Sequence, residues 1–211
     1  MSSETSPLIS KEEQCKKFQE EKSKIDILTR ESNYPEAIEK YKELIKNIQD
    51  TVKKNYREEK EFFAKELLIP IYSNLCFIYI KQNDYNSIVQ NANIILKIDK
   101  ENIKALYRKC FAEINMYEFE KTEEDINKLR KLMPGSNELQ KLENLLDEKK
   151  TEDNLKKMKK YKNMMRYYHK MNEENEYKNL SKIGKFFYHC KGYCRIIFCC
   201  CNKRKTIKKS Y

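Results

Sequence analysis

The chain has 211 residues and a formal net charge of +11; 36% of its residues are charged, but only three are glycine and four are proline. So few chain-breaking residues favour an all-α protein over a sheet of short strands, and the length fits one domain with an appendage. With two histidines, no phosphate-binding loop and no nucleophile–base motif, we expect neither an enzyme nor a bound cofactor or metal ion.

The N-terminal stretch holds no apolar segment, and residue 2 is serine. A secretory signal requires such a segment and N-myristoylation requires glycine at that position, so the sequence predicts neither. We therefore expect a cytosolic chain with reduced cysteines, in which residues 1–10 are disordered.

Apolar residues recur at helical spacing in three successive segments of the chain. The three sets are Tyr34, Ala37, Tyr41 and Leu44; Leu75, Tyr79, Tyr85, Ile88 and Ile95; and Ala112, Phe119, Ile126 and Leu129. Tyr85 and Phe119 are 34 residues apart, as are Asn74 and Arg108. A period of 34 is typical of stacked helix–turn–helix units, which leave a concave groove that binds a peptide.

The first two units are spaced more widely than the last two. Tyr34 precedes Tyr85 by 51 residues, so 17 extra residues lie between these units, around positions 48–63. We expect them to extend the two flanking helices, because long structureless loops are uncommon in compact domains. Cys76 and Cys110 occupy the same position of the repeat and are expected to be buried, inert thiols.

Three segments carry a family resemblance: "SNYPEAIEKYKELI", "IPIYSNLC" with its proline four residues before the asparagine, and "KKMKKYKNMMRYYHKMNEE". They resemble the tetratricopeptide repeat (TPR), and in particular the three-repeat domain of large immunophilins and of the aryl-hydrocarbon-receptor-interacting protein, over roughly residues 15–175. The resemblance implies a three-repeat superhelix with a long C-terminal capping helix over 11–178. The stretch before the first helix is too short for the immunophilin isomerase domain, so we expect no isomerase activity.

The resemblance also implies a site. In co-chaperones of this family, five groove positions clamp the terminal carboxylate and acidic side chains of a heat-shock chaperone's C-terminal tail. By repeat register these positions are Lys22, Asp26, Asn74, Lys104 and Arg108. Ammonium, guanidinium and amide groups are suitable donors to a carboxylate, and three or four such bonds predict roughly micromolar affinity.

Asp26 departs from the pattern, because many clamps have asparagine there. A carboxylate at this position repels an acidic ligand unless Lys22, one helical turn earlier, neutralises it. Two interpretations therefore stay open: a co-chaperone adaptor with a working clamp, and a scaffold for a different peptide with a vestigial one.

The end of the predicted capping helix is basic and amphipathic. Residues 155–172 hold seven Lys and Arg and no acidic residue. The apolar stripe on this segment consists of Leu155, Met158, Tyr161, Met165 and Tyr168. The segment is interpreted as the second half of a capping helix, with a calmodulin target or a surface-seeking helix as the alternatives.

The C-terminal tail, 179–211, combines positive charge with cysteine. From Tyr177 to the end there are ten Lys and Arg and no acidic residue, which leaves residues 1–176 with a net charge of +1. Five cysteines lie among aromatic and aliphatic residues: Cys190, Cys194, Cys199, Cys200 and Cys201. Lysines interrupt the apolar run before it could span a bilayer, so we predict S-acylation and attachment to an anionic membrane surface. Zinc binding with His189, or a disordered end, is the alternative; no motif indicates specific binding of nucleic acid.

Overall fold

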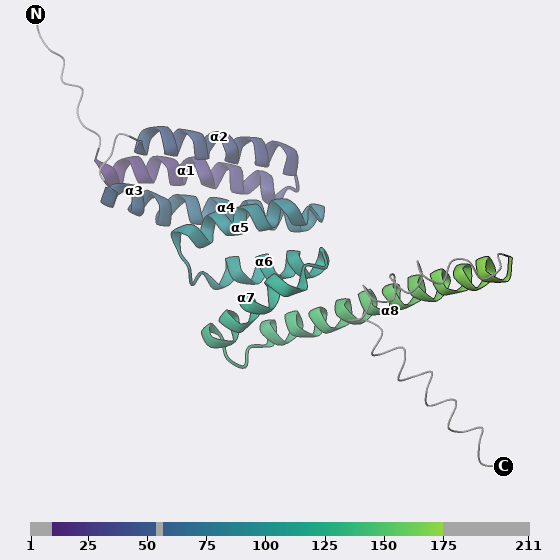
Figure 1. Ribbon diagram of the computed structural model, residues 1–211. Helices are drawn as coiled ribbons and strands as arrows, with labels where there is room; N and C mark the ends of the chain where they lie inside the picture. Colours follow the sequence, from purple (N-terminus) through teal and green to yellow (C-terminus); the bar gives the residue numbers. More distant parts are fainter. Residues whose placement is uncertain (1–9, 54–56, 175–211) are drawn as a thin grey trace, which may run out of the picture. The chain divides into compact units, whose positions relative to one another are not determined.

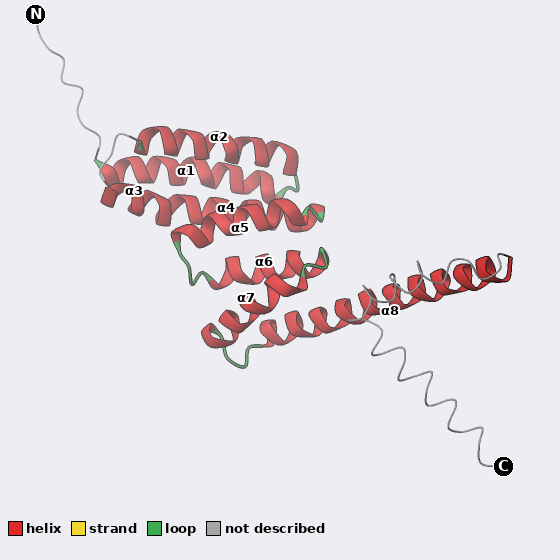
Figure 2. Ribbon diagram, in the orientation of Figure 1, coloured by secondary structure: helices red, strands yellow, loops and turns green. Residues whose placement is uncertain are grey.

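A computed structural model of the protein describes residues 10–53 and 57–174, with side chains up to residue 168 (Figure 1). This part of the chain consists of helices and short connections, without a strand (Figure 2). The elements are α1 (Lys11–Arg30), α2 (Tyr34–Val52), α3 (Arg57–Phe63), η1 (Ala64–Leu68), α4 (Ile69–Gln82), α5 (Tyr85–Ile98), α6 (Ile103–Asn115), α7 (Phe119–Leu132) and α8 (Asn137–Glu174). The chain forms two compact units, Met1–Asn154 and Leu155–Tyr211, which share α8.

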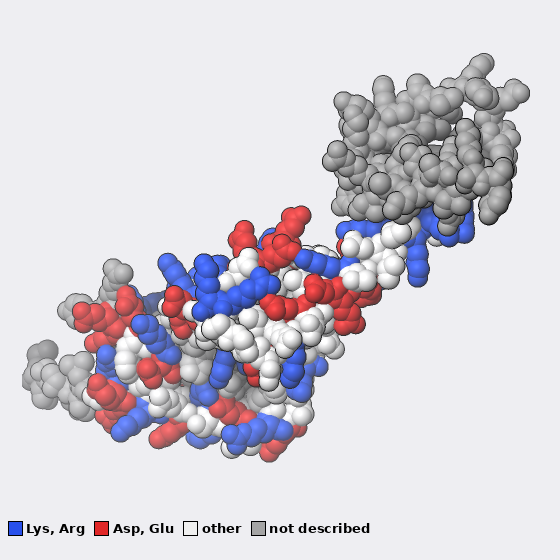
Figure 3. All heavy atoms as spheres, turned by 90° about the horizontal axis from the view of Figure 1, so that it is seen from below, with Lys and Arg blue, Asp and Glu red and all other residues white. Residues whose placement is uncertain are grey.

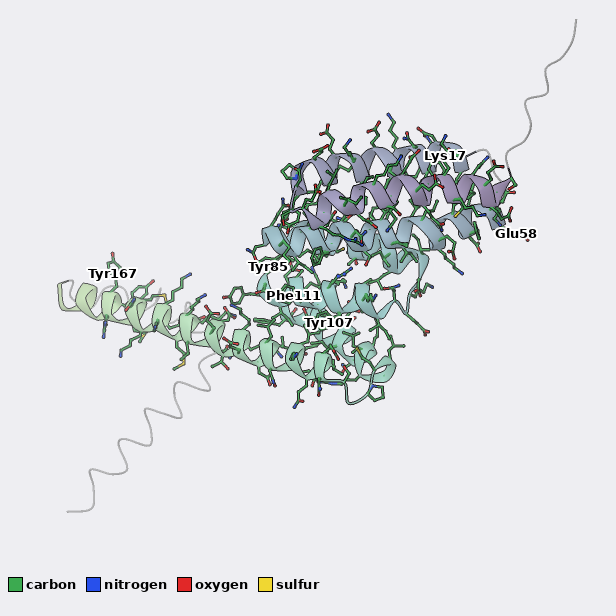
Figure 4. The ribbon with its side chains drawn as sticks, turned by 180° about the vertical axis from the view of Figure 1, so that it is seen from behind. Lys17, Glu58, Tyr85, Tyr107, Phe111 and Tyr167 are labelled. Atoms are coloured by element: carbon green, nitrogen blue, oxygen red, sulfur yellow. The ribbon has the colours of Figure 1, made fainter. Side chains whose placement is uncertain are left out.

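The first unit is built from three helical hairpins. Helix α1 packs on α2, α4 on α5, and α6 on α7, while α5 also packs on α6 and joins two of the hairpins. Tyr85 of α5 and Phe111 of α6 meet edge to face, with ring centroids 6.3 Å apart (Figure 4). Burial of such aromatic and aliphatic faces holds the stack together, and the predicted three-repeat all-α superhelix is confirmed.

The turn inside each hairpin has the same backbone conformation. Three residues other than glycine adopt the left-handed region, with φ between 56° and 63°: Ser32, Asn83 and Tyr117. Each of them stands two residues before the first residue of the next helix. The repeat therefore extends to the backbone, although serine, asparagine and tyrosine share no side-chain chemistry at this position.

The long first hairpin arises from extended helices, as its spacing predicted. Helix α2 continues to Val52, and the next helix begins at Arg57. That helix contains a π-helical turn, η1, which ends two residues before Pro70. Proline has no N–H to donate and its ring collides with the carbonyl four residues back, so the helix winds more loosely here and the Ile69 N–H bonds to Ala64 O.

The core follows the predicted apolar positions. Tyr41, Ile88 and Ile126 are 0–1% exposed, and their neighbours fill the space between successive hairpins. Cys76 and Cys110 are free and fully buried, and this burial raises the pKa of their thiols to about 11 and about 12. Both thiols stay protonated at neutral pH, which makes them unreactive, as the sequence predicted.

One continuous helix among the described residues, Glu58–Gln82, is long and apolar enough to cross a membrane by length and composition alone. In this structure most of the apolar side chains of the helix pack inside the protein. Phe63, Leu67 and Ile71 are 0% exposed and belong to the core of the first unit. Packing inside the repeats accounts for the apolar character of this segment.

The first half of α8 covers the last hairpin, which confirms the predicted capping role. Leu139, Leu142 and Leu146 are 1–6% exposed and lie in one cluster with residues of α6 and α7. Over the visible face of the repeats, basic and acidic residues are interspersed (Figure 3). This agrees with the near-zero net charge of residues 1–176.

Within the second unit, the described part of α8 exposes its apolar residues. Leu155 is 54% exposed, Met158 is 58% exposed and Tyr167 is 61% exposed. The predicted lipidation cysteines and the zinc alternative lie in residues 175–211, outside the described residues. The predicted disordered N-terminus lies outside them as well, except for Ser10, whose hydroxyl accepts the Glu13 N–H and caps α1.

Candidate functional site

The first helices of the three hairpins carry all five predicted groove residues. Lys22 and Asp26 stand one turn apart on α1, Asn74 lies on α4, and Lys104 and Arg108 stand one turn apart on α6. Helix α4 contacts both α1 and α6. Residues separated by more than 80 positions in the sequence are thereby brought to three neighbouring helices.

Asp26 lies at the centre of a hydrogen-bond network that joins α1, α2 and α4. Lys22 Nζ lies 2.7 Å from Asp26 Oδ2. The other oxygen, Oδ1, accepts hydrogen bonds from Asn74 Nδ2, at 2.8 Å, and from the Tyr41 hydroxyl. The Asn74 nitrogen also lies 3.1 Å from the Tyr41 hydroxyl oxygen, which closes a three-membered ring of donors and acceptors.

Tyr41 is the member of this network that sequence reasoning missed. Its position in the repeat predicted a core side chain, and the residue is indeed 0% exposed. The hydroxyl nevertheless reaches the groove residues, and burial, reinforced by the hydrogen bond to Asp26, raises its pKa to about 12. Tyr41 is therefore a neutral hydrogen-bond donor to a carboxylate at physiological pH.

Arg108 is held against α4 by a residue that the sequence analysis also missed. Its Nη1 donates to the backbone carbonyl of Ser73, at 2.8 Å, and to the Ser73 hydroxyl. Partial burial lowers the pKa of the guanidinium, which stays charged at neutral pH because arginine starts so high. Ser73 directly precedes Asn74, so Arg108 is docked on α4 next in sequence to a residue of the Asp26 network.

Lys104 is the most open of the five residues. It lies in the first turn of α6, which begins where the Asn102 side chain accepts the Ala105 N–H at 3.1 Å. Its side chain is exposed, and it forms no ion pair with any residue that the structure describes. The structure thus joins Lys22, Asp26 and Asn74 by direct contact. Arg108 contacts Ser73, the residue before Asn74. Lys104 stands one turn before Arg108 on the same helical face, with its side chain exposed.

A second charged cluster, on α6 and α7, has a structural role. Lys109 pairs with Asp125 and, at 3.3 Å, with Glu113, and both acids are at most 4% exposed. Burial alone would lower the pKa of Lys109, but its two acidic partners outweigh burial and raise it. The network ties the third hairpin together. Among the described residues no group of His, Cys, Asp and Glu is arranged to hold a metal ion.

Comparison with known proteins finds several FK506-binding proteins among the similar sequences and structures. No protein-family model matches the chain. FK506-binding protein 59 of Drosophila melanogaster is 32% identical over 101 residues, which is 48% of this chain and 23% of that protein. Peptidyl-prolyl cis-trans isomerase FKBP4 of Bos taurus is 25% identical over 157 residues, 74% of this chain and 34% of that protein. The chain therefore spans about a third or less of the length of these relatives.

A solved structure is similar to this chain over more than half of its length. The C-terminal TPR-containing domain of a Plasmodium falciparum FK506-binding protein superposes with a TM-score of 0.59 and 26% identity, over 69% of this chain and 95% of that domain. Aryl-hydrocarbon-interacting protein-like 1 of Bos taurus is also similar, with 27% identity over 151 residues. The helical hairpins described here form a TPR domain of the kind found in FKBP-type co-chaperones.

Proposed function

We propose that the protein is a co-chaperone adaptor whose groove binds the acidic C-terminal peptide of a heat-shock chaperone. The observation that carries this proposal is the arrangement on α6, where exposed Lys104 and docked Arg108 share one helical face beside Asn74. The similarity to TPR domains of FKBP-type proteins supports it. The repeats supply no catalytic arrangement, and we expect no prolyl isomerase activity from this chain.

Lys104 and Arg108 contribute to such binding in different ways. Arg108 is held in place by Ser73 before any ligand arrives, so it loses little conformational freedom on binding. Lys104 is an exposed charge that pairs with an acidic side chain of the ligand. Charge-assisted hydrogen bonds contribute ~1.5–3 kcal/mol each, so loss of either residue is expected to weaken binding by roughly tenfold or more.

The test is calorimetric titration with a peptide that ends in Glu-Glu-Val-Asp. Lys104→Glu and Arg108→Ala should abolish or strongly weaken binding. Circular dichroism should not change, because Lys104 is an exposed charge and the loss of the Arg108 bonds to Ser73 is small compared with the stability of a whole domain. Lys42→Glu is the matched control, since Lys42 is an exposed lysine on α2, outside the groove helices. Wild-type affinity in both groove variants would show that the peptide binds elsewhere or that the protein serves another ligand.

The proposal includes attachment to a membrane through the tail. Its support is compositional: five clustered cysteines and ten basic residues without an acidic one, all after residue 176. Acyl chains contribute ~0.8 kcal/mol per buried CH₂ and basic residues about 1 kcal/mol each near an anionic leaflet. The two terms together give stable attachment where either alone would not.

Replacement of all five tail cysteines by serine should release the protein into the soluble fraction of cells, while the groove still binds the peptide. Deletion of residues 202–211 should weaken attachment less, because the acylation sites remain. A variant with five serines that stays on membranes would contradict the proposal. A wild-type protein that resists hydroxylamine and contains zinc would favour the metal alternative.

A further inference from the structure

The Asp26 network determines which atoms the groove presents to a ligand at its α1–α4 end. The Asn74 side-chain atom that faces the carboxylate must be nitrogen, because an oxygen there would confront another acceptor. The same nitrogen also lies within hydrogen-bond distance of the Tyr41 hydroxyl, which itself donates to Asp26, so the two oxygens lie side by side and share one hydrogen of the amide. Asn74 therefore has one N–H and its carbonyl oxygen, Oδ1, left for a ligand, and both are uncharged.

Asp26 offers an acceptor and no donor. Its Oδ1 already accepts two hydrogen bonds and its Oδ2 accepts one from Lys22, which leaves one lone pair on a side chain that is 25% exposed. Lys22, the cation at this end, is 19% exposed and faces the Asp26 charge at 2.7 Å. The charges of Lys22 and Asp26 sum to zero, whereas a clamp for a carboxylate needs a net positive charge.

We propose that Asp26 acts as a built-in carboxylate that neutralises Lys22 and makes the α1–α4 end of the groove an uncharged polar subsite. This inference rests on the proposed function, in that the groove is a peptide site. The ligand it fits carries acidic side chains toward Lys104 and Arg108 and presents an uncharged polar group, such as a backbone amide, to Asn74 and Asp26. The free C-terminal carboxylate of the peptide gains nothing at this end.

The experiment compares one peptide in two forms, a free acid and a C-terminal amide, both ending in Glu-Glu-Val-Asp. The wild-type protein should bind the two forms with affinities within about twofold of each other. Asp26→Asn removes the built-in charge and releases Lys22 and the Asn74 amide, so this variant should prefer the free acid by about tenfold. Asp50→Asn is the matched control, because Asp50 also pairs with a nearby lysine, Lys53, but lies on α2, outside the groove helices. The ratio of its two affinities should equal that of the wild type.

A wild-type protein that already prefers the free acid tenfold, with no change in Asp26→Asn, would overturn the inference while leaving the proposed function intact. If neither form binds either protein, the proposed function fails and an NMR measurement decides the inference. The side-chain amide protons of Asn74 should exchange with water more slowly than those of exposed Asn144 in the wild type, and lose this protection in Asp26→Asn. Equally fast exchange in both proteins would refute the network itself.

Discussion

Helix α8 contains two halves of equal length with opposite character. Residues 137–154 hold six acidic and three basic residues, and their leucines are buried against α6 and α7. Residues 155–172 hold seven basic residues and no acidic one, and Leu155 and Met158 are more than half exposed. One unbroken helix thus passes from a packed segment to one in which apolar side chains such as Leu155 and Met158 are exposed.

The difference shows that an amphipathic pattern alone does not identify a core. Both halves have apolar residues at helical spacing. Among the described residues, the leucines of the first half pack against a hairpin, whereas Leu155 and Met158 of the second half are exposed. The second half combines exposed apolar groups with charge of a single sign, which is the composition of a helix that lies on an anionic surface. Four measurements test this contrast, in order of expected effect.

The largest difference should appear when one leucine is removed from each half. Leu142→Ala should lower the free energy of unfolding by ~2–5 kcal/mol, because Leu142 is 1% exposed and its loss leaves a cavity. Leu155→Ala should change it by less than ~0.5 kcal/mol, because Leu155 already contacts water. Chemical denaturation measures both values. Equal losses would mean that the two halves are packed alike.

Alkaline pH should separate a packed tyrosine from an exposed one. The pKa of Tyr41 is raised to about 12, whereas an unfolded tyrosine ionises near pH 10. The stabilisation of the folded state that this pKa difference provides is fully present below pH 10 and is lost as the pH rises to 12, which lowers the free energy of unfolding by roughly 2–3 kcal/mol. Tyr41→Phe should lose less stability across this window than the wild type, and Tyr167→Phe, in the exposed half of α8, should behave like the wild type.

A charge reversal in the exposed half should affect surface binding and leave folding unchanged. Lys159→Glu combined with Lys160→Glu should weaken binding to phosphatidylserine-containing vesicles by at least about tenfold, since each lysine contributes about 1 kcal/mol. The same reversal at Lys42 and Lys46 of α2 is the control. Unchanged vesicle binding, together with calcium-dependent binding to calmodulin, would instead identify residues 155–172 as a calmodulin target.

The smallest effect is expected from truncation after Asn154. The first unit keeps every buried residue of the core, so its thermal midpoint should move by no more than about 2 °C. Differential scanning calorimetry of the full chain and of the truncated chain measures the two thermal midpoints. A much larger decrease would show that the second unit stabilises the repeats.

Most of the fold could be predicted because it repeats. The spacing of Tyr85 and Phe119 predicted the two hairpins that α4, α5, α6 and α7 form. The 17 extra residues between the first two units were correctly assigned to longer helices. The candidate site could be predicted only as a set of positions. The period of 3.6 residues identifies Tyr41 as apolar and buried but gives no information about its hydroxyl, which bonds to Asp26 on another helix.

The partners of the groove residues depend on how helices cross, which no local pattern contains. Asn74 bonds to a residue 48 positions away, and Arg108 bonds to one 35 positions away. Asp26 was recognised as a departure, but whether it would repel a ligand or be satisfied internally depended on side-chain rotamers. Only the three-dimensional arrangement shows that Asn74 and Tyr41 both donate to it.

The π turn η1 sets the rotational phase of the longest core helix. Its deeply buried residues Phe63, Leu67, Ile71 and Leu75 recur every fourth position, and in a straight α-helix a period of four drifts by about 40° per step. A looser turn in the middle subtracts from that drift and returns the later residues to the face of the earlier ones. Loss of a single residue from 64–68 would restore a regular helix and leave the two ends in nearly the same rotational phase, because five residues of a π turn and four residues of an α-helix both rotate through about 400°. The turn therefore holds one residue more than an α-helix would, while the buried faces on either side of it stay aligned.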